Sequence, residues 1–220
     1  MPPVAAVLAA VAAALETVGL GVRLFDVRGA LGHLLSMDLP GSLPRLFVAS
    51  VLAAAAVVAA LGAWLRPGRR VWWSAVAASA VGLAAAKAAG DLHVRLVHLF
   101  GTGEQAWRGA VVLGIVTAAG LVFLWRLSGN DRRDRRRIVT LLAGYAVAAV
   151  GLSLVSTYAR ITAGPVSAAF ATFVEESGEA LTAAGLLVAV LIGVLPRLVL
   201  PAGDVLRRRD DHLEAAPLAA

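Results

Sequence analysis

The chain has 220 residues and a net charge of +6, and it is 60% hydrophobic but only 15% charged. Because a water-soluble domain is about half apolar and a quarter charged, this composition excludes an ordinary soluble protein. The sequence has no cysteine, which excludes disulfides, thiolate metal sites and cysteine nucleophiles. Its arginines cluster at the ends of apolar segments, which favours a membrane protein and argues against a nucleic-acid partner.

Six apolar segments predict an all-α fold, a polytopic membrane helix bundle of about six transmembrane helices. Each segment is long enough for a hydrocarbon core of ~30 Å, which takes ~20 helical residues. The first segment lacks the basic start of a signal peptide, so we expect it to be retained as a span. Residues 1–203 are then a single transmembrane domain, and 204–220 are a disordered cytoplasmic tail. The predicted spans are 3–24, 44–65, 71–100, 105–127, 138–162 and 166–195.

The arginines also predict the orientation of the bundle. The connections after the second and fourth segments and the tail carry thirteen arginines, against six on the other side. Since basic residues are retained in the cytoplasm, both termini should be cytoplasmic. Nineteen arginines against one lysine suggest a high-GC bacterial source, so we expect a multi-pass protein of the bacterial inner (plasma) membrane. The arginine-rich connection Arg126–Arg137 is long enough to bind anionic lipid headgroups.

Two further features predict how the segments meet the bilayer. Phe25–Leu43 is interpreted either as a short interfacial helix, with Val27, Leu31 and Met37 on one face, or as an ordinary ordered loop. Segments two and four lack a polar stripe, so we expect them to face lipid while the other four surround a polar interior. Tryptophans near segment ends suggest an interfacial belt. These are Trp64, Trp72, Trp73, Trp107 and Trp125.

Ionisable residues inside the predicted spans are the main functional signal. A charge at the bilayer centre costs at least ~2.5–3.5 kcal/mol on insertion scales, so it requires a partner, water or a role. At ~1.5 Å per residue, Glu16 lies ~20 Å and Lys87 ~24 Å from the cytoplasmic edge. Glu175 and Glu179 lie ~12 and ~18 Å below the opposite edge, so these depths overlap.

The helical spacing predicts that these groups face one another. At 100° per residue, Glu175, Glu176 and Glu179 share one face of the sixth segment. Burial and like charge both disfavour ionised carboxylates, so at least one should be protonated near neutral pH. A shared proton suits proton transfer, cation binding or general acid catalysis, although such groups can also simply fix helix packing. The candidate ion- or substrate-binding residues are Glu16, Lys87, Asp91, Glu175, Glu176, Glu179, Arg160 and Tyr145.

The sequence predicts no cofactor and no structural metal. His93 and His98 share one segment, so they cannot ligate a haem from two facing helices. The metal-binding pairs His-x-x-x-His and Glu-x-x-His do not occur. An all-carboxylate cation site on the sixth segment remains an alternative, because hard cations prefer oxygen ligands.

Three functions fit this pattern, and whether the protein is an enzyme stays open. The first is a small proton- or cation-coupled transporter or permeation protein. The second is a membrane-embedded enzyme acting on a lipid or isoprenoid-like substrate, with a protonated glutamate as general acid. The third is a non-catalytic subunit or assembly factor. The expected partners are the lipid bilayer, anionic headgroups at Arg126–Arg137, and further copies or subunits in a membrane complex.

Overall fold

The computed structural model describes residues 2–90, 106–129 and 132–200, and this part of the chain is helical without any strand. The N-terminal helices are α1 (Pro3–Leu24), α2 (Gly29–Leu35), α3 (Leu43–Leu65), the 3-10 turn η1 (Pro67–Arg69) and α4 (Arg70–Ala89). The later ones are α6 (Ala106–Leu127), α7 (Arg132–Ala146), the π-helical η3 (Val147–Leu152), α8 (Ser153–Thr162), α9 (Gly164–Val194) and α10 (Pro196–Val199).

Five stretches in the described residues are long and apolar enough to cross a membrane. The helix α6 adds a shorter apolar stretch, Val111–Leu127. The expected all-α bundle of membrane-spanning helices is thus confirmed, while the count of six and the orientation stay predictions. The five stretches are Pro3–Leu24, Leu43–Leu65, Pro67–Ala89, Arg132–Thr162 and Gly164–Val194.

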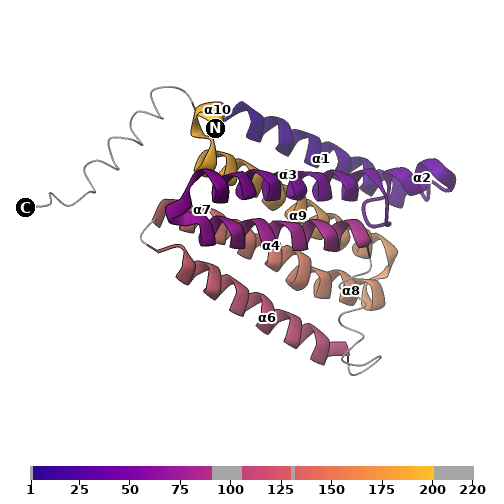
Figure 1. Ribbon diagram of the computed structural model, residues 1–220. Helices are drawn as coiled ribbons and strands as arrows, with labels where there is room; N and C mark the ends of the chain where they lie inside the picture. Colours follow the sequence, from indigo (N-terminus) through magenta and orange to yellow (C-terminus); the bar gives the residue numbers. More distant parts are fainter. Residues whose placement is uncertain (1, 91–105, 130–131, 201–220) are drawn as a thin grey trace, which may run out of the picture.

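The long helices lie side by side in one bundle (Figure 1). At one end lie the α3–α4 turn, the start of α7 and the last turn of α9, and we call this the arginine-rich end. The other end, which we call the opposite end, holds α2 and the junction of α8 with α9. The helix α9 is central, because it packs against α1, α3, α7 and α8.

The helix α3 is also central, which corrects the expectation that the second segment faces lipid. It packs against both α4 and α9, and Val48, Leu52 and Ala59 are fully buried. The expectation failed because an apolar helix without a polar stripe can face either lipid or protein. Small side chains such as alanine let helices approach closely, and α3 therefore packs against other helices and not against lipid. The helix α6 does lie at the edge of the bundle (Figure 1).

Glycines on α9 bring α7 and η3 close to it. A Cβ atom on Gly178 would lie 3.0 Å from the Cβ of Ala148 in η3, and one on Gly185 would lie 2.7 Å from Leu141 of α7. On another side of α9, a Cβ on Gly193 would lie 2.5 Å from the ring of Trp73. Small residues at such spacings are typical of tightly packed membrane helices.

Two expectations about the arginine-rich end are wrong. The residues 132–137 are not loop but form the first turns of α7, where Asp134 is buried and pairs with Arg69 at 3.0 Å. Trp72 and Trp73 are not interfacial but 2% and 0% exposed, and the Arg69 guanidinium lies 5.6 Å from the Trp73 ring centroid. The ion pair thus joins η1 to α7, and the cation–π contact holds the same arginine against the start of α4.

The connection between α1 and α3 contains the short helix α2, so the helical interpretation of this connection is the correct one. Its apolar face is exposed at Leu31, but Met37 lies beyond the helix and is fully buried. Met37 packs on α1, where a Cβ on Gly19 would lie 2.9 Å from the Met37 Cβ. The segment after α2 therefore folds back across the opposite end of the bundle.

Candidate functional site

The centre of the site is an ion-pair cluster between α4 and α9. The Lys87 ammonium donates to Oε2 of Glu176 and, at 2.7 Å, to Oε2 of Glu179. All three side chains are buried, with Lys87 4% exposed and each glutamate 7% exposed. Glu176 and Glu179 are three residues apart, so they lie on one face of α9 and can share a single cation.

The helical stretch from α7 to α8 adds two hydroxyl donors to the carboxylates of α9. The phenol of Tyr145 donates to Glu179 at 2.8 Å, and the hydroxyl of Ser156 donates to Glu175 at 2.6 Å. The π-helical η3 lies between these two donors and packs on Gly178. Such π segments often occur at functional sites, because they change which side chains face a neighbouring helix.

Glu16 brings a third span, α1, to the cluster. Its side chain is 1% exposed, and its Oε2 has no hydrogen-bond partner among the described residues. Coulombic interactions link it to Glu176, Lys87 and Glu179. A buried ionised carboxylate without a hydrogen bond is costly, so this position favours either a proton or a bound cation.

Arg45 also belongs to the cluster, and the sequence did not reveal it. It is 8% exposed, and its guanidinium donates to the backbone oxygens of Asp38, at 3.0 Å, and Gly90, at 3.2 Å. Coulombic interactions link it to Lys87 and Glu176. Its position beside Pro44 at the start of a span suggested a loop charge. Its side chain lies in the interior only because of how the neighbouring elements pack around it.

The charges that the described residues bring to the cluster do not balance. Three buried carboxylates, Glu16, Glu176 and Glu179, face two buried cations, Lys87 and Arg45, and the half-buried Glu175 adds a further carboxylate. Bound protons or monovalent cations would neutralise the remaining negative charge in this low-dielectric interior. Within the described residues, no three His, Cys, Asp or Glu side chains are arranged to hold a metal ion.

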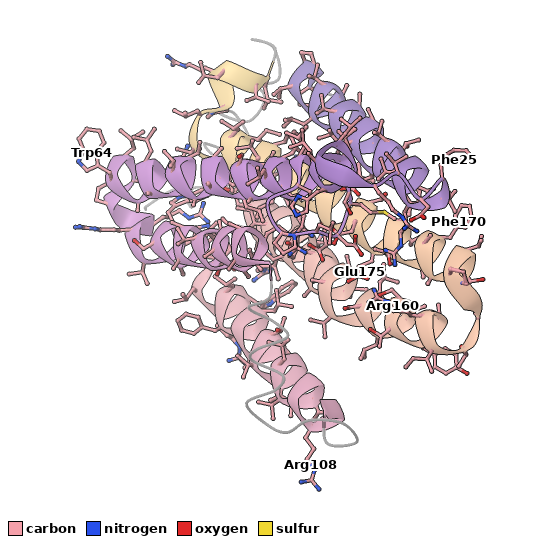
Figure 2. The ribbon with its side chains drawn as sticks, turned by 90° about the vertical axis from the view of Figure 1, so that its right-hand side faces the viewer. Phe25, Trp64, Arg108, Arg160, Phe170 and Glu175 are labelled. Carbon is pink, nitrogen blue, oxygen red and sulfur yellow. The ribbon has the colours of Figure 1, made fainter. Side chains whose placement is uncertain are left out.

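The remaining sequence candidates lie differently. Glu175 is half-buried and is linked to the cluster through coulombic interactions with Glu179 and Lys87. Arg160 lies exposed on α8, and among the described residues no hydrogen bond or ion pair joins it to the cluster (Figure 2). Asp91, with its expected pairing to Lys87, lies outside the described residues, as do His93 and His98.

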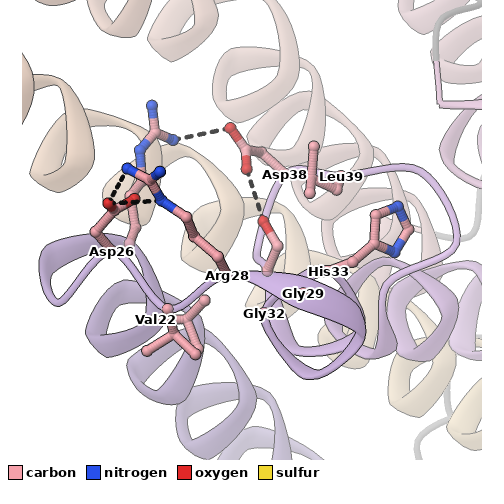
Figure 3. A pocket seen from close by; sticks show the side chains of 11 residues that line it. Val22, Asp26, Arg28, Gly29, Gly32, His33, Asp38 and Leu39 are labelled. Carbon is pink, nitrogen blue, oxygen red and sulfur yellow. Dashed lines mark hydrogen bonds and ion pairs between the residues drawn. The ribbon is translucent and has the colours of Figure 1, made fainter.

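A polar pocket of about 380 Å³ lies at the opposite end, between the end of α1 and the segment around α2 (Figure 3). Arg23 donates to Asp38 at 2.8 Å, and Ser36 donates to the other oxygen of Asp38 at 3.0 Å. The exposed Arg28 pairs with Asp26 and lowers the pKa of that carboxyl below its ordinary value, because the hydrogen bond favours the ionised form. Asp38 interacts coulombically with Glu16, so the pocket is electrostatically linked to the interior.

The fold and this interior define a class: a helical, membrane-embedded protein with ion pairs buried between its spans and one buried carboxylate oxygen that has no hydrogen-bond partner among the described residues. Comparisons with protein-family models, with curated proteins and with solved structures find no match to this chain.

Proposed function

We propose that the protein is a small proton-coupled transporter or proton-permeation protein, and that its proton-binding site is the cluster around Lys87. One observation carries this proposal: Glu16 is buried, no described residue donates a hydrogen bond to its Oε2, and it interacts with two glutamates that already share one ammonium group. Ionisable residues at this depth are typical of proton and ion pathways in membranes.

The cluster provides a way for one proton to alter several contacts. An ammonium group has three N–H donors, and Lys87 directs two of them to Glu176 and Glu179. When Glu16 is protonated, these contacts are undisturbed. When Glu16 loses its proton, its negative charge competes for Lys87 and weakens the pairing with α9. Proton occupancy on α1 is thereby coupled to the packing of α4 against α9.

We propose that the polar pocket is where the proton enters from the opposite end. Asp38 lines the pocket and interacts with Glu16, while Arg23 holds Asp38 in an ion pair. Both side chains are partly exposed, at 28% for Arg23 and 31% for Asp38. In this proposal, protons enter at the pocket and reach Glu16 past the Arg23–Asp38 ion pair.

The test is proton flux into liposomes that contain the purified chain and a pH-sensitive dye. Glu16→Gln keeps the size of the side chain but removes its exchangeable proton. We expect it to reduce the flux by about tenfold or more, since a positioned proton-transfer group contributes ~10²–10⁴-fold. Repeating the assay with sodium or potassium gradients separates proton coupling from coupling to another cation.

The matched control is Thr17→Val, a similar-sized change at the exposed neighbouring residue of α1. It should leave the flux unchanged. Wild-type flux equal to that of empty liposomes would refute the proposal, as would an unchanged flux in Glu16→Gln at equal incorporation.

A second function, that of a non-catalytic subunit or assembly factor, is favoured by the pairing of Glu176 and Glu179. Lys87 and Tyr145 satisfy these carboxylates within the fold, so the cluster also serves as a clamp between α4, α7 and α9. This function predicts no flux in any variant.

A further inference from the structure

We propose that the groove between α7 and α9 at the arginine-rich end binds one acidic phospholipid. The groove has a volume of about 430 Å³, which lies within the ~300–1,000 Å³ of ordinary ligand pockets. Its lining combines Arg136 and Arg137 with an apolar surface formed by Leu141, Val188 and Ile192. This site is independent of the cluster around Lys87.

The two arginines are available for a ligand. Both are exposed, and no carboxylate of the described residues forms an ion pair with either of them. Their neighbour Arg135 instead lies over the ring of Trp125, 4.4 Å from its centroid. Two adjacent free guanidinium groups complement a phosphate, because each presents several N–H donors in a planar fork.

The apolar part of the groove determines what else the ligand must contain. Gly185 and Leu141 are in close contact at the inner end of this groove, since a Cβ on Gly185 would lie only 2.7 Å from Leu141. From Ile192 to Gly185 the groove follows α9 for about 10 Å toward the middle of the bundle. A free phosphate would leave this surface uncovered, whereas an acyl chain would fill it. Basic pockets between membrane helices commonly bind acidic lipid headgroups.

The experiment measures which lipids stay with the full chain after extraction from bilayers of equal phosphatidylglycerol and phosphatidylcholine. Bound lipids are quantified by mass spectrometry for the wild type, for Arg136→Gln/Arg137→Gln, and for a control outside the segment Arg126–Arg137, Arg70→Gln/Arg197→Gln. The control removes the same charge from exposed arginines at the same end of the bundle. A third variant, Thr140→Trp, keeps both arginines but fills the groove with an indole ring.

The wild type and the control should both retain phosphatidylglycerol in preference to phosphatidylcholine. Arg136→Gln/Arg137→Gln should reduce this preference on the order of tenfold, because each basic side chain near an anionic headgroup contributes severalfold. Thr140→Trp should release the bound lipid. Equal losses in the two double variants, retention in Thr140→Trp, or no preference in the wild type would each overturn the proposal.

Discussion

Lys87 is the only lysine of the chain, and it interacts with Glu16 of α1 as well as with two glutamates of α9. Its charged end ties Glu176 and Glu179 to α4. Glu16 differs from these two glutamates, because its Oε2 has no such tie. Loss of the Lys87 charge should therefore lower the free energy of unfolding, whereas loss of the Glu16 carboxyl breaks no ion pair of this kind.

Lys87→Met removes the shared cation while keeping a side chain of similar length. We expect the free energy of unfolding to fall by about 3–5 kcal/mol, the usual cost of leaving a buried charge without its partner. Reversible unfolding in mixed micelles measures this change. The triple variant Lys87→Met/Glu176→Gln/Glu179→Gln should regain much of the loss, since it removes all three charges together. A single variant as stable as the wild type would show that Lys87 is not the cation that holds the cluster.

At the scale of the elements, the glycines of α9 allow neighbouring helices and side chains to pack closely against it. Gly178 admits the π-helical η3, Gly185 admits α7, and Gly193 admits the ring of Trp73. These contacts also place the carboxylates, because Glu175 and Glu179 can reach Ser156 and Tyr145 only when η3 lies close to α9. The glycines of α9 are thus part of the architecture of the site.

Gly193→Ala tests this close packing at the arginine-rich end. Its Cβ would lie 2.5 Å from the Trp73 ring, which is fully buried and cannot move aside easily. The added atom should lower the free energy of unfolding by about 1–3 kcal/mol, as overpacking of a core does. Gly82→Ala is the control, because nothing lies within 4 Å of a Cβ on this exposed residue of α4. The control should be neutral or slightly stabilising, and an equal loss in both variants would contradict the account.

For the whole molecule, hydropathy predicted most of the helices but not their arrangement. A helix that crosses a membrane needs a long apolar run, and such runs are visible without neighbours. Thus the first apolar run, 3–24, corresponds to α1. The central position of α3 depends on which helices surround it, and its apolar sequence is compatible with lipid or protein on every side.

The candidate site was predictable to the extent that it depends on helical spacing. The shared face of Glu176 and Glu179 follows from their separation by three residues. The convergence of Lys87 and Glu16 on that face was suggested only by overlapping depths. The inward turn of Arg45, the η3 segment and the Asp134–Arg69 pair depend on contacts between distant elements, so no local pattern indicated them.

In our proposal, the buried carboxylates of the described interior outnumber its buried cations, and a proton on Glu16 offsets the excess negative charge. Infrared spectroscopy of the full chain in lipid measures this directly, because a protonated carboxyl has a C=O stretching band that an ionised carboxylate lacks. At neutral pH, the wild type should show such a band with a shift in deuterium oxide, and Glu16→Gln should lose it. A wild type without the band, or a band unchanged in Glu16→Gln, would contradict the account.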